Sequence, residues 1–75
     1  MTTDSIRAAI QARPFKPFVI RTGDGSTYAV THPELITQSK GGRTIIIFGP
    51  GDEELSILDL LLVTALEYRS SISAH

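Results

Sequence analysis

The sequence predicts a mainly β fold, in which an N-terminal helix precedes five antiparallel strands that form a small, strongly bent barrel. Three observations support this prediction. The only helical spacing of apolar residues lies at the N-terminus, β-branched and aromatic runs of strand length follow it, and turn residues separate these runs at regular intervals. We expect a single domain over residues 1–75, with the helix at about 4–13, the barrel at about 15–68 and a frayed tail at 69–75.

The helix is predicted by its capping and by its apolar stripe. Thr3-Asp4 opens the segment, and Ile6, Ala9 and Ile10 follow at i, i+3, i+4 spacing. Pro14 ends it, because proline has no backbone N–H to continue the helical ladder. About ten residues are too few for a helix to be stable alone. We therefore expect it to lie as a lid on the strands.

The strands are separated by three predicted turns: Gly23-Asp24-Gly25, Lys40-Gly41-Gly42 and Gly49-Pro50-Gly51-Asp52. Four of the five expected strands are Phe18–Thr22, Arg43–Phe48, Glu53–Leu58 and Leu62–Tyr68. The remaining strand, second in the chain, is long: it runs from Ser26, bends at His32-Pro33-Glu34 and continues over Leu35–Ser39. Arg43–Phe48 is apolar on both faces, and we therefore expect it to be a central strand.

The segment after Leu58 fits two interpretations. Asp59-Leu60-Leu61 indicates one helical turn before a final strand, but the leucines between residues 58 and 66 also fit the spacing of a helix that ends at Tyr68. The strand is preferred because Ile57 and Val63-Thr64 add β-branching and because a further strand is needed to close the barrel. A helix here would make the protein an α+β sheet.

Composition and charge exclude several classes of function. There is no cysteine, which rules out a disulfide or a thiolate metal site. No signal-peptide core or membrane-length apolar run is present, and we expect a cytoplasmic protein that does not enter the membrane. The net charge of −1 lacks the basic excess of strong nucleic-acid binders, whereas residues 1–43 carry about +3 and residues 44–75 about −4. This asymmetry favours head-to-tail self-association.

The order of elements resembles the Sm-like fold, an SH3-like small barrel, over about residues 3–68. Separately, a set of short strings resembles a family of short bacterial proteins of unknown activity: Arg13-Pro14-Phe15-Lys16-Pro17-Phe18, Asp24-Gly25, His32-Pro33-Glu34, Asp59-Leu60-Leu61 and Val63-Thr64. The Sm-like resemblance implies rings of six or seven subunits that bind single-stranded RNA. The sequence departs from it at the RNA contacts: Lys40-Gly41-Gly42 replaces the family's Asp, aromatic and Asn loop, and Asp59-Leu60-Leu61 replaces its Arg-Gly pair.

Five residues are the candidate contacts for RNA or another ligand: Arg13, Lys16, His32, Lys40 and Arg43. The first two are interleaved with Phe15 and Phe18, whose rings would either stack on bases or plug the mouth of the barrel under the helix. We prefer the plug.

The sequence offers no catalytic residue. His32 with Glu34 has the chemistry of a proton shuttle, but no nucleophile stands at a motif spacing from it. Asp52-Glu53-Glu54 lacks the spacing of a calcium loop, and the glycine-rich turns lack the residues of a phosphate cradle. We expect neither enzymatic activity nor a metal or cofactor.

The apolar content exceeds the needs of a 75-residue barrel and predicts a homo-oligomer interface. Its candidate residues are Ile45, Ile46, Ile47, Leu60 and Leu62. The functional hypothesis is a non-enzymatic, self-associating interaction module. The alternative is an Sm-like ring that binds single-stranded RNA.

Overall fold

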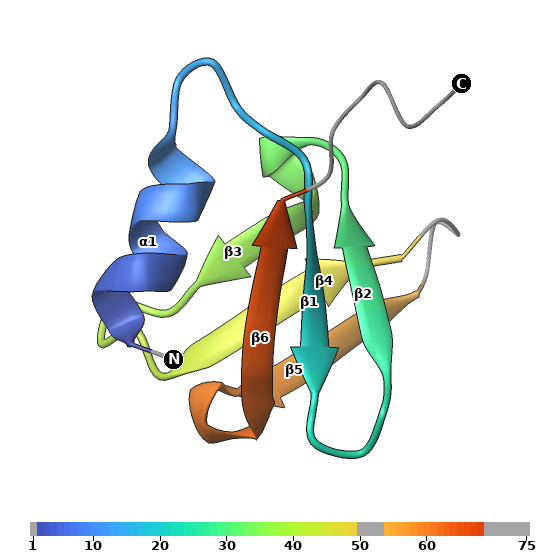
Figure 1. Ribbon diagram of the computed structural model, residues 1–75. Coiled ribbons are helices and arrows are strands. Elements are labelled where there is room, and N and C mark those ends of the chain that lie inside the picture. Colours follow the sequence, from blue (N-terminus) through green and yellow to red (C-terminus); the bar gives the residue numbers. More distant parts are fainter. Residues whose placement is uncertain (1, 50–53, 69–75) are drawn as a thin grey trace, which may run out of the picture.

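The computed structural model describes residues 2–49 and 54–68, which form one helix, six strands and two short 3-10 turns (Figure 1). The elements in chain order are α1 (Thr3–Gln11), β1 (Phe18–Thr22), β2 (Thr27–Val30), η1 (Pro33–Leu35), β3 (Ile36–Gln38), β4 (Thr44–Phe48), β5 (Leu55–Asp59), η2 (Leu60–Leu62) and β6 (Val63–Tyr68). The expected start of a strand at Glu53, much of the third turn and the tail at 69–75 lie outside the described residues.

The six strands form two antiparallel sheets of three strands each. The first sheet has the order β2-β1-β6 and the second has the order β3-β4-β5. The chain crosses from the first sheet to the second through η1 and returns through η2. Both 3-10 turns therefore form corners at which one edge strand leads into an edge strand of the other sheet.

This arrangement confirms a mainly β chain with an N-terminal helix and corrects the number of strands. The long bent strand expected from Ser26 to Ser39 is two strands, because η1 interrupts it at Pro33, which has no N–H to donate. Within the described residues the strand ladders remain two separate sheets and do not join into one closed barrel. The segment after η2 is a strand, and the helical alternative for it is wrong.

Helix α1 begins one residue earlier than predicted and ends two residues earlier. The Oγ1 atom of Thr2 accepts a hydrogen bond from the Ser5 backbone N–H at 3.1 Å, which caps the first turn. The helix buries Ile6 and Ala9 and leaves its opposite side exposed. As predicted, its apolar stripe packs on the strands.

The core lies between the two sheets. It contains mainly β-branched side chains that point inward from both sheets, together with the apolar side of α1. The largest of its fully buried side chains are Ile6, Phe18, Ile20, Val30 and Ile45. Phe15 packs against this cluster with its ring centroid 5.6 Å from that of Phe18, in agreement with the plug that the sequence suggested.

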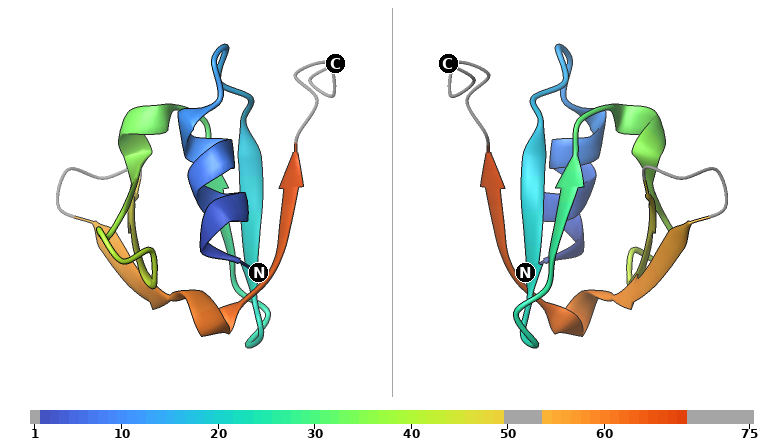
Figure 2. Two further views of the ribbon diagram at one scale, coloured as in Figure 1. Left: turned by 90° about the vertical axis from the view of Figure 1, so that its left-hand side faces the viewer. Right: turned by 90° about the vertical axis from the view of Figure 1, so that its right-hand side faces the viewer.

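Away from the corners made by η1 and η2, the sheets diverge on two sides. On one side α1 lies between them and contacts β3, while the first sheet presents β6 (Figure 2). On the other side, where β2 faces β5, no helix or strand of the described part covers the gap. The helix is thus a lid on one of two open sides.

Candidate functional site

The outward side of the second sheet is unusually apolar. β4 and β5 pair so that Ile46 lies opposite Ile57 and Phe48 lies opposite Leu55. Ile57 is 65% exposed, Leu55 51% and Phe48 41%, and Ile46 is half-buried. We call these four residues the outer apolar face. Contiguous exposed apolar side chains of this kind mark interaction sites more often than scattered ones do.

Among the described strands, none pairs with the edge of β5 that faces away from β4. Gly49 N–H donates to the Glu54 carbonyl at 2.9 Å, and Leu60 N–H donates to the Arg43 carbonyl at 2.7 Å. Hydrogen-bonded pairs alternate along an antiparallel ladder, so the peptide groups of Leu55 and Ile57 point away from β4. No other described strand pairs with that edge. Free backbone groups and apolar side chains therefore occur on the same strand.

The 3-10 turn η2 extends the apolar surface beyond β5. The Oδ1 atom of Asp59 accepts from the Leu61 N–H at 2.9 Å and caps the turn. This geometry buries Leu60 and leaves Leu61 77% and Leu62 54% exposed.

The predicted interface residues divide between core and surface. Ile45, Ile47 and Leu60 are buried in the core of the chain, and each is at most 5% exposed. Ile46 and Leu62 retain exposed surface. This division follows from the strand period of two, because alternate residues of the apolar run on β4 point to opposite sides of the sheet.

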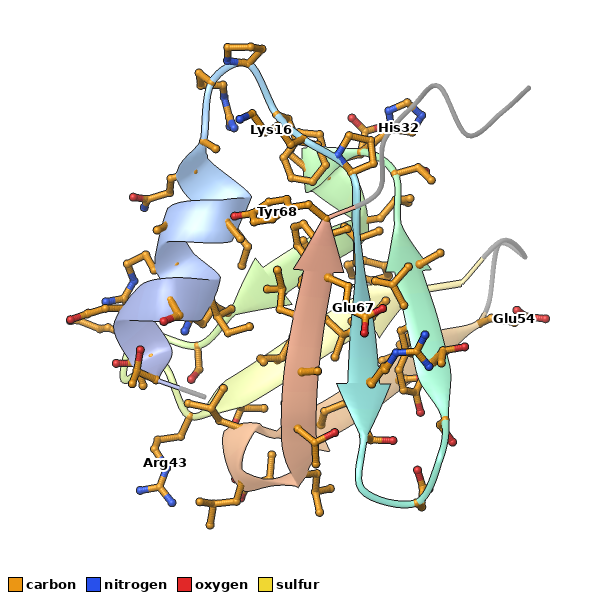
Figure 3. The ribbon with its side chains drawn as sticks, viewed as in Figure 1. Lys16, His32, Arg43, Glu54, Glu67 and Tyr68 are labelled. Atoms are coloured by element: carbon orange, nitrogen blue, oxygen red, sulfur yellow. The ribbon has the colours of Figure 1, made fainter. Side chains whose placement is uncertain are left out.

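The predicted basic contacts do not form one surface. Lys16 and His32 lie at one end of the molecule and Arg43 at the other (Figure 3). Arg13 belongs to the loop beside Lys16 and donates to the carbonyls of Ile10 and Ala12, while Lys40 lies in the β3–β4 turn that Arg43 closes. The structure brings together Arg13 with Lys16, and Lys40 with Arg43, but not the two pairs.

Within the described residues, the structure does not join His32 to Glu34 as a proton shuttle would require, and it does not group acidic side chains as a metal site would require. His32 and Glu34 are both exposed, and no hydrogen bond or ion pair joins them. Glu54 is exposed, while Asp52 and Glu53 lie outside the described residues. Across residues 2–49 and 54–68, no three His, Asp or Glu side chains are grouped to hold a metal ion.

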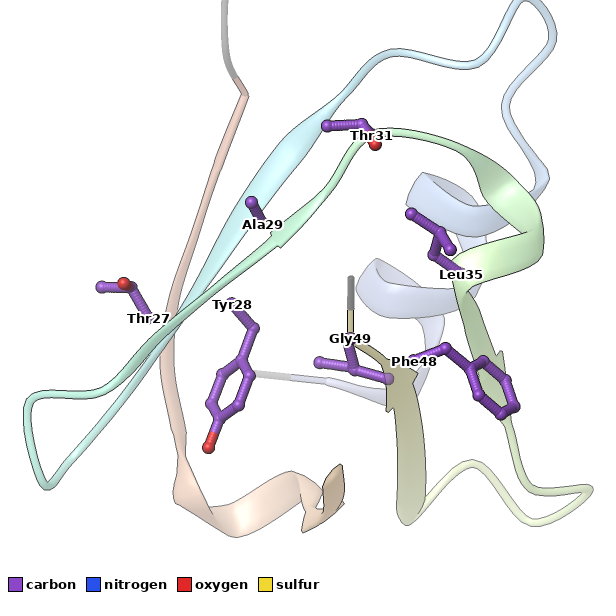
Figure 4. A pocket seen from close by; sticks show the side chains of 8 residues that line it. Thr27, Tyr28, Ala29, Thr31, Leu35, Phe48 and Gly49 are labelled. Carbon is purple, nitrogen blue, oxygen red and sulfur yellow. The ribbon is translucent and has the colours of Figure 1, made fainter. Parts of the chain in front are cut away.

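Two hollows lie on the open side, where β2 faces the second sheet, and Figure 4 shows the larger of them. The larger has a volume of about 470 Å³ and is lined by Thr27, Tyr28, Ala29, Thr31, Leu35, Ile47, Phe48 and Gly49. The smaller, about 110 Å³, is lined by Thr22, Gly23, Asp24, Tyr28, Leu58 and Leu62. Tyr28 lines both, so its side chain lies where they meet.

A hydrogen-bonded turn holds Asp24, the one acidic side chain among the described residues that line these hollows. The Asp24 carboxylate accepts hydrogen bonds from the Thr22 hydroxyl and, at 3.0 Å, from the Ser26 N–H. These bonds stabilise the ionised form and lower the pKa of Asp24 below its ordinary value, the Thr22 hydroxyl having the larger effect.

Sequence reasoning missed Leu55, Ile57 and Phe48 as surface residues and missed Tyr28 as the centre of a site. For Phe48, Leu55 and Ile57, the sequence signal was the excess of apolar residues in β4 and β5. Because Ile57 and Leu58 are both apolar, alternation does not reveal which of them faces the core.

Comparisons with protein-family models, with curated proteins and with solved structures gave no match to this chain. None of the helical segments described for residues 2–49 and 54–68 has the length and apolar character needed to span a bilayer.

Proposed function

We propose that this protein is a non-enzymatic interaction module that associates with copies of itself through the outer apolar face and the free edge of β5. One observation carries this proposal: Leu55 and Ile57 expose apolar side chains and unpaired peptide groups on the same strand. A second strand placed beside β5 would bury both at once.

The physical argument rests on how natural proteins protect strand edges. Exposed edges usually carry lysine, proline or a bulge, which prevent pairing with another chain. The described residues of β5 have none of these, and charge occurs only beside and at the end of the strand, at Glu54 and Asp59. The edge of β5 therefore lacks the features that usually prevent pairing with a second strand.

Charge supports a head-to-tail arrangement. Antiparallel pairing of β5 with β5 of a second copy would bring the carboxylates of Glu54 and Asp59 close to those of its partner. The N-terminal half of the chain carries the basic excess, about +3 against −4. A basic surface of the next copy is therefore the better neighbour for this edge.

The order of elements supports an Sm-like small barrel as the finer description of the fold in this proposal. The first strand lies between the second and the last in one sheet, and η1 and η2 connect the sheets at the bends. The RNA-binding activity of that fold has less support here, because the basic residues lie at opposite ends of the molecule.

The test is the molar mass in solution, measured by light scattering after size exclusion. The wild type should elute at a multiple of the 8.1 kDa chain mass, and Ile57→Lys should elute as a monomer. Ala8→Lys adds the same charge at an exposed position of α1 and should retain the wild-type mass. Circular dichroism should show the same fold in all three proteins, because both substituted side chains are exposed.

Two results would overturn this proposal: a monomeric wild type at high concentration, or an Ile57→Lys variant with unchanged mass. The ratio of absorbance at 260 and 280 nm, read on protein purified without nuclease, tests the alternative. Nucleic acid that co-elutes with a six- or seven-subunit mass would favour the RNA-binding ring.

A further inference from the structure

The open side between β2 and the second sheet has the features of a binding groove for an extended chain. On the opposite side of the molecule α1 fills the corresponding gap and buries Ile6 and Ala9 there. The β2 side has no such cover among the described elements and contains the two hollows that meet at Tyr28.

Within the part of the chain that the structure describes, no strand pairs with the edge of β2 along this groove. Thr22 N–H donates to the Ser26 carbonyl at 3.0 Å, which makes these two residues a hydrogen-bonded pair. Continued along the ladder, the alternation directs the peptide groups of Tyr28 toward β1 and those of Thr27 and Ala29 away from it. Thr27 and Ala29 both line the larger hollow. Their N–H and C=O groups are thus available to a strand laid in the groove.

The lining is apolar where a side chain of that strand would enter. Leu35 and Ile47 line the larger hollow, and Leu58 and Leu62 line the smaller. Phe48 also borders the larger hollow, but its ring points away from Tyr28 and belongs to the outer apolar face (Figure 4). A volume of about 470 Å³ accommodates more than one aliphatic side chain. Exclusion of water from these walls would supply the driving force for binding.

Two carboxylates at the groove favour a peptide that carries basic residues beside its apolar side chain. Asp24 lines the smaller hollow, and the Glu54 side chain lies against Gly49, which lines the larger: a Cβ atom built on Gly49 would lie 2.7 Å from Glu54 Oε1. None of the described lining residues carries a positive charge. A ligand with a basic residue on either side of its apolar anchor would therefore match both ends.

We infer that this groove binds an extended peptide segment of a partner protein, which adds a strand to the free edge of β2, inserts an apolar side chain beside Tyr28 and places lysine or arginine near Asp24 and Glu54. This mode of recognition takes affinity from main-chain hydrogen bonds and specificity from pockets for alternate side chains. The inference does not rest on self-association, because the peptide would pair with the edge of β2, whereas the proposed self-association uses the edge of β5; the two surfaces adjoin and share Phe48.

The test begins with selection of random heptapeptides displayed on phage against the immobilised protein. Enriched peptides should alternate apolar and polar positions and carry lysine or arginine. A synthetic peptide of the consensus sequence is then titrated into the wild type and two variants at position 29. Ala29→Pro removes the free N–H without breaking the β1–β2 ladder, and Ala29→Val keeps that N–H.

We expect Ala29→Pro to weaken binding at least tenfold and Ala29→Val to remain within about threefold of the wild type, with circular dichroism confirming the fold of both. Asp24→Asn should weaken binding and reduce its dependence on salt. Enrichment of no consensus, enrichment of acidic peptides, or equal binding to both position-29 variants would overturn the inference. If Ile57→Lys is monomeric but still binds the peptide with the affinity of the wild type, peptide binding is independent of self-association.

Discussion

Gly42 and Thr3 are in direct contact, so that a Cβ atom on Gly42 would lie 2.7 Å from the Cβ atom of Thr3. Gly42 also has a φ of +87°, which side chains rarely adopt. The Nε2 group of Gln38 donates to the carbonyls of both residues, at 3.2 Å to Thr3 and 3.0 Å to Gly42. The start of α1 is thereby fixed to the β3–β4 turn.

Replacement of Gly42 by alanine should therefore destabilise the protein. The new methyl group would meet Thr3 and would also hold a strained φ, and we expect a loss of roughly 1–3 kcal/mol in the free energy of unfolding. The neighbouring Gly41→Ala is the matched control, because nothing lies within 4 Å of its Cβ position. Urea unfolding measures both, and equal effects of the two substitutions would contradict the contact.

Removal of the Gln38 side chain should also weaken the attachment of α1. Gln38→Ala removes the side-chain donor that joins the carbonyls of Thr3 and Gly42 in a partly buried place, at a cost of about 1–3 kcal/mol. Thr37→Ala changes an exposed side chain on the same strand and should cost less than about 0.5 kcal/mol. Thermal unfolding followed by circular dichroism compares them, and similar melting temperatures would refute the bridging role of Gln38.

Two adjacent isoleucines of β4 should respond differently to truncation. Ile45 is fully buried, and Ile45→Ala should cost about 2–5 kcal/mol because it leaves a cavity in the core. Ile46 belongs to the outer apolar face, and Ile46→Ala should cost less in unfolding but should weaken self-association. Urea unfolding at low protein concentration gives the first effect and molar mass at high concentration gives the second. The reverse order of costs would show that β4 buries its other face.

Asp24 should make stability depend on pH in the acid range. Its pKa is lowered in the folded protein by the Thr22 hydroxyl and the Ser26 N–H, so the unfolded chain binds a proton more readily than the folded one. The resulting stabilisation is present above the ordinary aspartate pKa of about 3.9 and is lost as the pH falls through the lower folded value. The difference in unfolding free energy between wild type and Asp24→Asn should shrink between about pH 5 and pH 2. A difference that stays constant over this range would exclude the effect.

The ion pair between Arg21 and Glu67, on the outside of the first sheet, should contribute little to the free energy of unfolding. Arg21 Nε lies 3.0 Å from Glu67 Oε2, but the two side chains are 47% and 51% exposed, so water and salt screen the attraction. A double-mutant cycle with Arg21→Gln and Glu67→Gln should give a coupling energy below about 1 kcal/mol that falls further in high salt. A larger coupling that survives high salt would mean that the pair is better shielded than its exposure indicates.

Local chemistry made much of the element order predictable from the sequence. Pro14 ends the helix, the Asp24-Gly25 pair forms the first hairpin, and the apolar run on β4 occupies the centre of its sheet, all as expected from the sequence. These features depend on neighbours within a few residues, where φ preferences and missing N–H donors decide the outcome. The same reasoning predicted that Phe15 and Phe18 pack under the helix.

The preferences of neighbouring residues could not predict where the candidate sites lie on the surface. Ile57 and Leu58 are equally apolar, and only the register of β5 on β4 exposes the first and buries the second. The basic residues likewise form sets in the sequence but occupy opposite ends of the fold.

The sequence by itself determined the helix, the positions of most turns and the apolar strands, because each follows from the conformational limits of a few adjacent residues. The sequence also placed the bend at His32-Pro33-Glu34. Only the tertiary structure decided which apolar side chains are exposed, that the strands on the two sides of η1 belong to separate sheets, and that α1 covers one open side while Tyr28 lies in a groove on the other. The physical reason is that all of these outcomes depend on how two sheets pack face to face, and residues far apart in the chain make that contact.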